Sequence, residues 1–377
     1  MQAAKPMEVR VVDDFASLAG EWEKLHASSQ SIFTSFDWLA LWWKHYGKGR
    51  PLKILCARTG GALVGILPLY IDTAPMLRFP VRQLRLVGTG GDTFPDDLGP
   101  ILLLGHENEA ARALADAVLE LPGWDVLLLH DLDPACAFTQ AMSQAAKRAH
   151  LPSLEGRSER IAFMNLAASW DDYLKSLHRD KRYRIKNIRK KLNAAHPSHF
   201  FVWSDAATLD QGFDRLVFLH RKRWDQAGLS HAFVSPEYLG FHRDVMHACL
   251  KKDRLRLYCL EIDGQVGAMY YFYKLRDRVF LMQSGFDPDL SDVKPGQVLL
   301  GHVIEHAISE GHKVLDFLRG EHRYKDELAT GERETVYLTA FRFRPGSLVW
   351  AARKLYLPQI KAWVMARLKP KETPPSA

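Results

Sequence analysis

The sequence has few cysteines, and they do not form the pattern of a metal or redox site. It contains four, Cys56, Cys136, Cys249 and Cys259, and none of them shows the close CxxC spacing that such sites use. We therefore expect reduced thiols in the core or in strands, and no metal cofactor.

Long apolar runs are also lacking. The longest, residues 62–71, spans about ten residues and contains Pro68, whereas a membrane-spanning helix needs about 20. Residues 1–10 lack the apolar stretch and the small-residue cleavage site of a secretion signal. These absences predict a cytoplasmic protein without a transmembrane segment.

Acidic residues are scarce in two stretches, and the net charge of +7 is concentrated in the first. Residues 175–191 contain nine Lys or Arg and one acid, so the rest of the chain is close to neutral. This stretch is typical of a solvated helix whose Leu177, Ile185, Ile188 and Leu192 touch the core. A helix on an anionic membrane or one that contacts RNA phosphates remains an alternative.

The second stretch, residues 347–371, carries six Lys or Arg and no acid among aromatic and aliphatic residues. That composition is typical of a helix at a membrane interface, although Pro358 interrupts it. The alternative is that the segment packs onto the body of the protein. We assign residues 346–377 to a basic amphipathic tail, which predicts peripheral contact with the inner membrane.

The chain contains an internal repeat with a constant offset of 200. The sequence FTSFDWL at residues 33–39 aligns with FVSPEYL at residues 233–239, and each reads as a helix start. The strand, turn and strand of residues 52–65 then match residues 255–267, with one residue more in the first turn.

A further strand, a helix and a buried strand follow in each half, at residues 81–87, 107–121 and 124–129 and at residues 279–283, 297–310 and 313–318. The pattern predicts an α/β (α+β) fold of two halves, each a mixed open sheet with helices packed on it. We place the halves at residues 8–160 and 161–345. Any two α/β halves share some of this pattern, but the ordered series of matches favours a repeat.

Four motifs together resemble a known family. They are FTSFDWLALWW at residues 33–43, GTGGDTFPDDLGP at 88–100, LHRKRW at 219–224 and DFLRGEHRYK at 316–325. In this order the chain resembles the CelD-type acetyltransferases, tandem GNAT-like proteins related to the Fem-type peptidyltransferases. The resemblance implies acyl transfer from acetyl-CoA or another acyl-CoA, with the donor site in the second half and a degenerate first half. The Fem relatives imply an alternative donor, aminoacyl-tRNA.

The donor phosphates need backbone N–H groups at a helix N-terminus, where the helix dipole also favours anions. The segment from Lys294 through Pro295 fits this need, because Pro and Gly open a helix directly after a cation. An ordinary helix start is the alternative. The residues assigned to the donor are Gln283, Lys294, Gly296, Gln297, Val298 and Lys325.

The strand at residues 313–318 is followed at once by a turn rich in chemically active side chains, the position where α/β sheets carry their chemistry. Glu321 or Asp316 is the candidate base for the acceptor proton. Tyr324 is the candidate acid for the departing thiolate, and Lys325 or Arg319 would hold a phosphate or an acidic acceptor. A solvated, salt-bridged turn is the alternative reading.

Acceptor residues are expected in two places. His220 and Arg223 lie three apart on an expected helix and so share a face, with Trp224 beside them. The Gly-rich segment 88–97 lacks the Lys-Ser/Thr of a phosphate loop and carries acids, so we assign Asp92 and Asp96 to a cationic or hydroxyl-rich acceptor. A structural helix and a plain surface loop are the alternatives. His220 is also a candidate base.

Two rival functions belong to other classes. The sequence HVIEH at residues 302–306 is an HxxEH, the inverted zinc-peptidase pattern, but no third ligand can be picked out. A non-catalytic scaffold in envelope polysaccharide assembly is the second rival. The favoured prediction is an acyltransferase that acts on an amine or hydroxyl of a small-molecule or envelope-related, glycan-like acceptor, with nucleic acid not expected except as tRNA.

Overall fold

The computed structural model describes residues 6–76, 79–228, 232–320 and 323–357. Its first half contains the elements expected from the repeat, in the expected order. They are β1 (Met7–Val12), α1 (Ala19–His26), α2 (Phe36–Tyr46), β2 (Leu52–Thr59), β3 (Ala62–Met76), β4 (Phe79–Leu86), β5 (Ile101–Leu102), α3 (Glu107–Glu120), β6 (Val126–Leu132) and α4 (Ala137–Arg148).

The second half repeats this order after an added pair of helices. Its elements are β7 (Ser153–Asn165), α5 (Trp170–Ser176), α6 (Arg179–Ala195), β8 (Ser198–Trp203), α7 (Leu209–Gln226), α8 (Pro236–Lys251), β9 (Leu255–Ile262), β10 (Gln265–Leu275), β11 (Arg278–Phe286), the 3-10 turn η3 (Pro288–Val293), α9 (Pro295–Ser309), β12 (Val314–Asp316), α10 (Arg323–Leu328) and β13 (Gly331–Phe341), followed by α11 (Pro345–Ala351) and the π-helical turn η4 (Ala352–Tyr356).

Local sequence explains why the two halves begin alike. The hydroxyl of Ser35 accepts a hydrogen bond from the backbone N–H of Trp38, and Ser235 accepts one from Tyr238, so both helices start with the same N-cap. The two hairpins also share a turn, because Gly60 and Gly61 in one and Asp263 and Gly264 in the other all have positive φ. Each turn has two residues between its strands, so the extra residue expected in the first turn is not found there.

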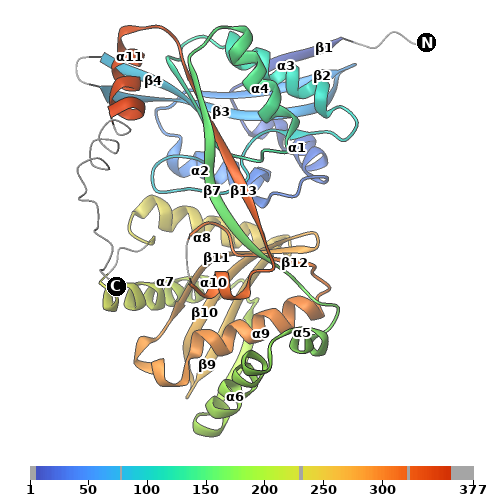
Figure 1. Ribbon diagram of the computed structural model, residues 1–377, viewed down its shortest axis with the longest axis vertical. Coiled ribbons are helices and arrows are strands. Elements are labelled where there is room, and N and C mark those ends of the chain that lie inside the picture. The colour runs from blue at the N-terminus through green and yellow to red at the C-terminus, as the bar shows by residue number, and fades with distance from the viewer. Residues whose placement is uncertain (1–5, 77–78, 229–231, 321–322, 358–377) are drawn as a thin grey trace, which may run out of the picture.

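The strands form one sheet in which the halves exchange their last strands. The order is β1-β2-β3-β4-β6-β13-β7-β12-β11-β10-β9-β8, with β5 paired to β3. β7 follows the first half in the chain but pairs with β12 of the second, and β13 follows the second half but pairs with β6 of the first. Figure 1 shows these two long strands running from the upper lobe to the lower one.

This exchange bears on the expected boundary between residues 160 and 161, which lies inside β7. β7 and β13 also pair with each other antiparallel over most of their length. The two halves therefore share a continuous backbone ladder rather than meeting at a linker.

The equivalent helices α2 and α8 pack against each other between the lobes. The indole ring of Trp38 meets the ring of Phe241 edge-on at a centroid distance of 4.9 Å. At the rim, Lys44 and His45 both contact the carboxylate of Asp244 at 2.7 Å. The aromatic core is therefore continuous from one half to the other.

The sheet of the second half is covered on both faces. The helices α7 and α8 pack on the face that carries Leu257 and Tyr271, and α9 packs on the opposite face, which carries Tyr258 and Phe272. The helices α5 and α6 pack on α9. Among the described helices none is long and apolar enough to cross a membrane.

The expected tail begins with α11, which packs onto the first half through Trp350, whose side chain is buried beside Met76 and Val81. Residues 358–377, and with them most of the tail segment, lie outside the described residues.

Candidate functional site

The candidate site lies where two parallel strands separate. β11 pairs with β12 only from Arg278 to Phe280, because β12 ends at Asp316, whereas β11 continues to Phe286. Beyond Phe280 the edge of β11 that faces away from β10 therefore lacks a partner strand among the described residues. Such an open edge leaves backbone groups for a ligand.

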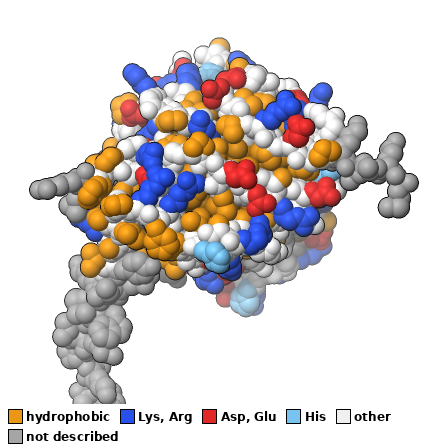
Figure 2. Space-filling model, turned by 90° about the horizontal axis from the view of Figure 1, so that it is seen from above, with side chains coloured by type: hydrophobic (Ala, Val, Ile, Leu, Met, Phe, Trp, Pro, Cys, Tyr) orange, Lys and Arg blue, Asp and Glu red, His pale blue; other side chains and the backbone are white. Residues whose placement is uncertain are grey.

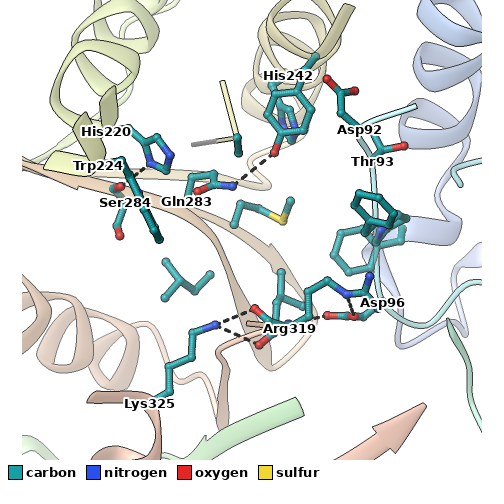
Figure 3. A pocket seen from close by; sticks show the side chains of 18 of the residues that line it. Asp92, Thr93, Asp96, His220, Trp224, His242, Gln283, Ser284, Arg319 and Lys325 are labelled. Atoms are coloured by element: carbon teal, nitrogen blue, oxygen red, sulfur yellow. Dashed lines mark hydrogen bonds and ion pairs between the residues drawn. The ribbon is translucent and has the colours of Figure 1, made fainter. Parts of the chain in front are cut away.

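A cavity of about 340 Å³ adjoins this edge, within the range of small-molecule sites. Both halves line it, as Figure 3 shows. The first half contributes Phe33, Trp38 and residues 92–96; the second contributes His220, Arg223, Trp224, Ala232, Tyr238, His242, residues 281–284, Leu318, Arg319, Tyr324 and Lys325. Nine of the residues predicted for the site thus meet in one cavity: Asp92, Asp96, His220, Arg223, Trp224, Gln283, Arg319, Tyr324 and Lys325.

His220 is held by β11. Its Nδ1 lies 2.8 Å from the carbonyl oxygen of Ser284, which can only accept, so Nδ1 carries a proton. This close approach requires Gly285, since an added Cβ there would lie 2.5 Å from the backbone nitrogen of His220. Arg223, one turn further along α7, donates to the Ser284 hydroxyl at 3.3 Å and stacks on Phe286.

The carboxylate of Asp92 joins the two halves. It accepts hydrogen bonds from the hydroxyl of Tyr46 at 2.6 Å and from the hydroxyl of Ser235, the N-cap of α8. The cationic or hydroxyl-rich acceptor expected at Asp92 would therefore meet a carboxylate that already accepts two hydrogen bonds from the protein.

The other acids of this loop pair with arginines of the second half. Asp96 accepts from the backbone N–H of Arg319 at 2.9 Å and from its Nε at 3.1 Å. Burial raises the pKa of Asp96 to about 7, although the Arg319 guanidinium opposes the shift. Burial likewise raises the pKa of Asp97, which pairs with Arg333, to about 6.

Asp316, one of the predicted bases, is not among the residues that line the cavity. It is fully buried, and its carboxylate contacts Arg278 at 3.3 Å and Arg333 at 3.1 Å. It also accepts from the backbone N–H of Leu318 at 2.9 Å. These partners hold the end of β12 and leave Asp316 without the access that a base needs.

The turn after β12 contains the other predicted groups. Glu321, the first candidate base, lies outside the described residues. The ammonium of Lys325 donates to three backbone carbonyls, those of Phe317, Leu318 and Arg319, at 2.8, 3.2 and 2.8 Å. Lys325 therefore stabilises this turn through backbone carbonyls, whereas the sequence predicted that it would bind a phosphate. Burial lowers its pKa to about 8.

Tyr324 lies between two cavities. It lines the cavity between the halves, and it also lines a second cavity of about 430 Å³ on the opposite face of the sheet. That second cavity is formed by α5, α6, α9 and α10, with Gln297 and Leu300 on one wall and Lys181 and Arg184 on another. Burial raises the pKa of the Tyr324 phenol to about 12.

The predicted donor residues on α9 differ in exposure. Lys294 has the left-handed conformation at the N-cap and is exposed, as is Gln297, whereas the side chain of Val298 is in the core. The backbone N–H groups of Gln297 and Val298 both bond to the Lys294 carbonyl. The helix start therefore offers fewer N–H donors to a phosphate than the sequence suggested.

The HxxEH residues have other partners. His302 stacks on Phe200 at 4.8 Å, and Glu305 pairs with Arg189 at 2.8 Å. In the described part of the chain no group of three or more His, Cys, Asp or Glu side chains is placed to hold a metal ion.

Several cavity residues were not predicted as site residues, among them Trp38, Tyr238 and His242. The first two stand at matching positions of the repeat, which was the available signal. The buried indole N–H of Trp38 has no hydrogen-bond partner among the described residues. His242 is fully buried, and burial lowers its pKa to about 3.

Comparison with protein families gives a match in the second half. Residues 179–326 match the family model of the acetyltransferase (GNAT) domain. This part of the second half is therefore similar to a GNAT domain, which agrees with the coarser part of the resemblance seen in the sequence. The comparison with curated proteins found no match.

Solved structures resemble the whole chain at low identity. FemX is 11% identical with a TM-score of 0.61, and the match covers 88% of this chain and 96% of FemX. The C-terminal domain of a putative lysylphosphatidylglycerol synthetase from Agrobacterium fabrum is 10% identical, with a TM-score of 0.54 and coverage of 90% and 95%. L-PGS from Bacillus licheniformis is 9% identical, with a TM-score of 0.50 and coverage of 89% and 96%. The chain shares their fold, which confirms the predicted mixed α/β architecture.

Proposed function

We propose that this protein is an acyltransferase that moves an acyl group from a donor held by the second half to an acceptor held between the halves. The observation that carries the proposal is the position of Tyr324, which lines a cavity on each face of the sheet beside the open edge of β11. Two reactants that entered from opposite faces would meet there.

The proposed donor is acetyl-CoA or another acyl-CoA, in keeping with the GNAT domain at residues 179–326. Its thioester would lie along the open edge of β11, and its phosphates near Gly296 at the start of α9. Lys181 and Arg184 on α6 line the cavity beside this helix and add positive charge.

The proposed chemistry uses His220 as the proton acceptor. An amine or hydroxyl of the acceptor attacks the thioester carbon while Nε2 of His220 takes its proton. The C–S bond then breaks, and the phenol of Tyr324 protonates the departing thiolate. His220 replaces Asp316 in this role because Asp316 is fully buried between two arginines. Glu321, the first candidate base from the sequence, becomes the second candidate in this proposal.

The proposed acceptor is a small molecule or a glycan-related group with an amine or hydroxyl. Aromatic rings make up much of the cavity wall, and the Trp38 indole supplies a hydrogen-bond donor. The acids at Asp92 and Asp96 already have donors within the protein, so the wall favours an uncharged ring over a strongly cationic ligand.

Calorimetric titration with acetyl-CoA tests the proposal. The parent should bind, and Gly296→Val should weaken binding at least about tenfold, because the added branch would press on Phe286, 3.1 Å from the Cβ position, and narrow the approach to the helix start. Gly20→Val, at a site with nothing within 4 Å, is the matched control and should bind like the parent. If the parent does not bind acetyl-CoA, the result would favour a non-catalytic scaffold or aminoacyl-tRNA as the donor.

Aminoacyl-tRNA is a second candidate donor, because α6 is strongly basic and lies over α9 beside the second cavity. Reversing the exposed cations Lys186, Lys190 and Lys191 to Glu distinguishes the two. A tRNA-dependent enzyme should lose tRNA affinity and show a shallower salt dependence. An acyl-CoA enzyme should keep its turnover nearly unchanged in the same variant.

A further inference from the structure

One surface of the first half is unusually apolar and basic. It surrounds α11 and η4, at the end of the described chain. Four of the ten large hydrophobic side chains that are markedly exposed in the described structure lie here: Phe79, Phe343, Leu348 and Leu357, with exposures of 45, 72, 46 and 53%. Arg353 and Lys354 are exposed among them. These six residues are called the docking face below.

Contacts place α11 and η4 beside β3 and the start of β4, which carries Phe79. α11 packs on β3 and β4, with Trp350 buried against Met76 and Val81. An added Cβ at Gly346 would lie 3.3 Å from the Cβ of Phe79, so the first turn of α11 lies against the start of β4. Arg353 reaches Met76, with Nη1 4.0 Å from the sulfur. Figure 2 shows hydrophobic and basic side chains gathered together on the side of the molecule where α11 lies.

The helix is anchored on one side only. Ser347, Trp350 and Ala351 are buried, whereas Leu348, Arg353 and Leu357 point away from the core. A helix that packs through one face and exposes aliphatic and basic residues on the other has the composition of an interfacial helix. Monomeric proteins seldom leave such apolar groups together in water without a partner.

The charge on this face identifies the partner. The sequence contains no Asp or Glu from residue 335 to residue 371, but eight Lys or Arg. The buried carboxylate of Asp125 nearby is already paired with Arg82 and Arg344. The face therefore carries one sign of charge, and its partner must be anionic.

Two other occupants fit less well. A two-fold dimer would place the face against its own copy, and so would bring Arg353 and Lys354 against the same cations. The remaining tail, residues 358–377, is itself basic, with four Lys or Arg and one acid, so it would repel the face as well. A nucleic acid is anionic, but exposed Leu and Phe side chains find no apolar phase along its backbone.

We propose that the docking face binds the surface of an anionic lipid bilayer. The exposed Phe and Leu side chains enter the boundary between headgroups and acyl chains, while Arg353 and Lys354 contact lipid phosphates. The proposal is independent of the acyltransferase reaction, because none of the six residues lines either cavity.

Co-sedimentation of the full chain with vesicles tests it. The parent should bind vesicles of phosphatidylcholine mixed with phosphatidylglycerol, bind vesicles of phosphatidylcholine alone much more weakly, and release at high salt. The double variant Phe343→Glu, Leu348→Glu should lose at least about tenfold in binding, because it removes two apolar insertions and adds two negative charges.

Leu104→Glu is the matched control, since Leu104 is 80% exposed and its segment adjoins the opposite end of β3, where Leu102 pairs with Gly65. That end is about 35 Å from Met76 along the strand. The control should bind like the parent, and unchanged thermal unfolding should show that both variants fold.

Three results with the parent and the double variant would overturn the proposal. They are full binding by the double variant, equal binding to neutral vesicles, and concentration-dependent dimers in light scattering that the double variant abolishes. Loss of binding in Trp363→Glu but not in the double variant would also overturn it, because binding would then belong to the tail alone. Retention of oligonucleotides in place of vesicles would assign the face to nucleic acid.

Discussion

The two halves have the same order of elements, but the gap between their parallel strands is open in the second half and bridged in the first. In the second half β11 and β12 separate, and a cavity adjoins the open edge. In the first half β4 and β6 also pair over three residues only, from Gln83 to Arg85, but here β4 ends at Leu86 and β6 continues to Leu132. There, however, the chain after β4 returns: Leu98 forms a parallel bridge with Leu132, and its N–H bonds to Asp131.

The helices that precede the shared N-cap differ as well. α1 ends at His26 and α2 begins at Phe36, while α7 ends at Gln226 and α8 begins at Pro236, so the offset of 200 persists across this connection. Gly20 therefore stands in the place of His220, and Trp42 in the place of His242. A fold can keep its repeat while only one copy keeps an open gap with titratable groups beside it.

The largest expected effect concerns the proton acceptor that the first half lacks. His220→Gln should lower kcat about 10²- to 10⁴-fold, the usual loss for a general base, with donor affinity unchanged. Release of free thiol from acetyl-CoA over a pH series measures it, and the rising limb should disappear in the variant. If the variant keeps more than half of the activity, the base lies elsewhere, and Glu321→Gln becomes the deciding experiment.

The next prediction concerns the residue that fills the first gap. Leu98 is 4% exposed, so Leu98→Ala should lower the free energy of unfolding by about 3 kcal/mol, through lost burial and the cavity left behind. Denaturant unfolding measures it. Leu281→Ala, at the wall of the second gap, should cost less because that wall already borders a cavity. Equal losses in the free energy of unfolding at the two positions would show that the first gap is not packed more tightly than the second.

Part of the acid sensitivity should come from the second half. Burial lowers the pKa of His242 to about 3, so the folded state holds it neutral while the unfolded chain protonates near pH 6.5. The unfolded state then binds more protons between these values, and stability falls as the pH drops from 6.5 toward 3. The share of His242 at pH 4 is on the order of 3 kcal/mol.

Unfolding of His242→Gln at several pH values measures this share. Its stability should change less than that of the parent between pH 6.5 and pH 4, whatever its stability at neutral pH. The equivalent Trp42 does not titrate in this range, and its indole N–H donates to the hydroxyl of Thr93 at 2.7 Å. An unchanged slope would place the acid-sensitive group elsewhere.

The smallest expected effect is the difference in stability between variants that lack one or the other N-cap. Ser35→Ala should cost about 1 kcal/mol, the usual loss of a helix cap. Ser235→Ala should cost more, because the same hydroxyl also donates to Asp92 of the first half. Thermal unfolding of both variants measures the difference, and equal costs would show that the bond to Asp92 adds nothing to the joining of the halves.

Several parts of the site could not be read from the sequence. Asp97 and Arg333 form an ion pair although they lie 236 positions apart in the chain. No short stretch of sequence contains both residues, so no local pattern could reveal the pair. The role of Lys325 was missed for a related reason: its partners are backbone carbonyls, which every residue carries, so no side-chain pattern marks them. The match between Phe33 and Phe233, in contrast, was visible at once because it lies within short aligned segments.

The sequence by itself determined the order of helices and strands, the two helix starts and the two hairpin turns. Each of these depends on hydrogen bonds and φ angles within a few residues, as the caps at Ser35 and Ser235 show. Only the tertiary structure decided that β7 and β13 change places, that Leu98 closes one gap, and that the carboxylates of the first-half loop are already paired. These outcomes depend on contacts between distant segments, whose energies are set by packing rather than by local sequence.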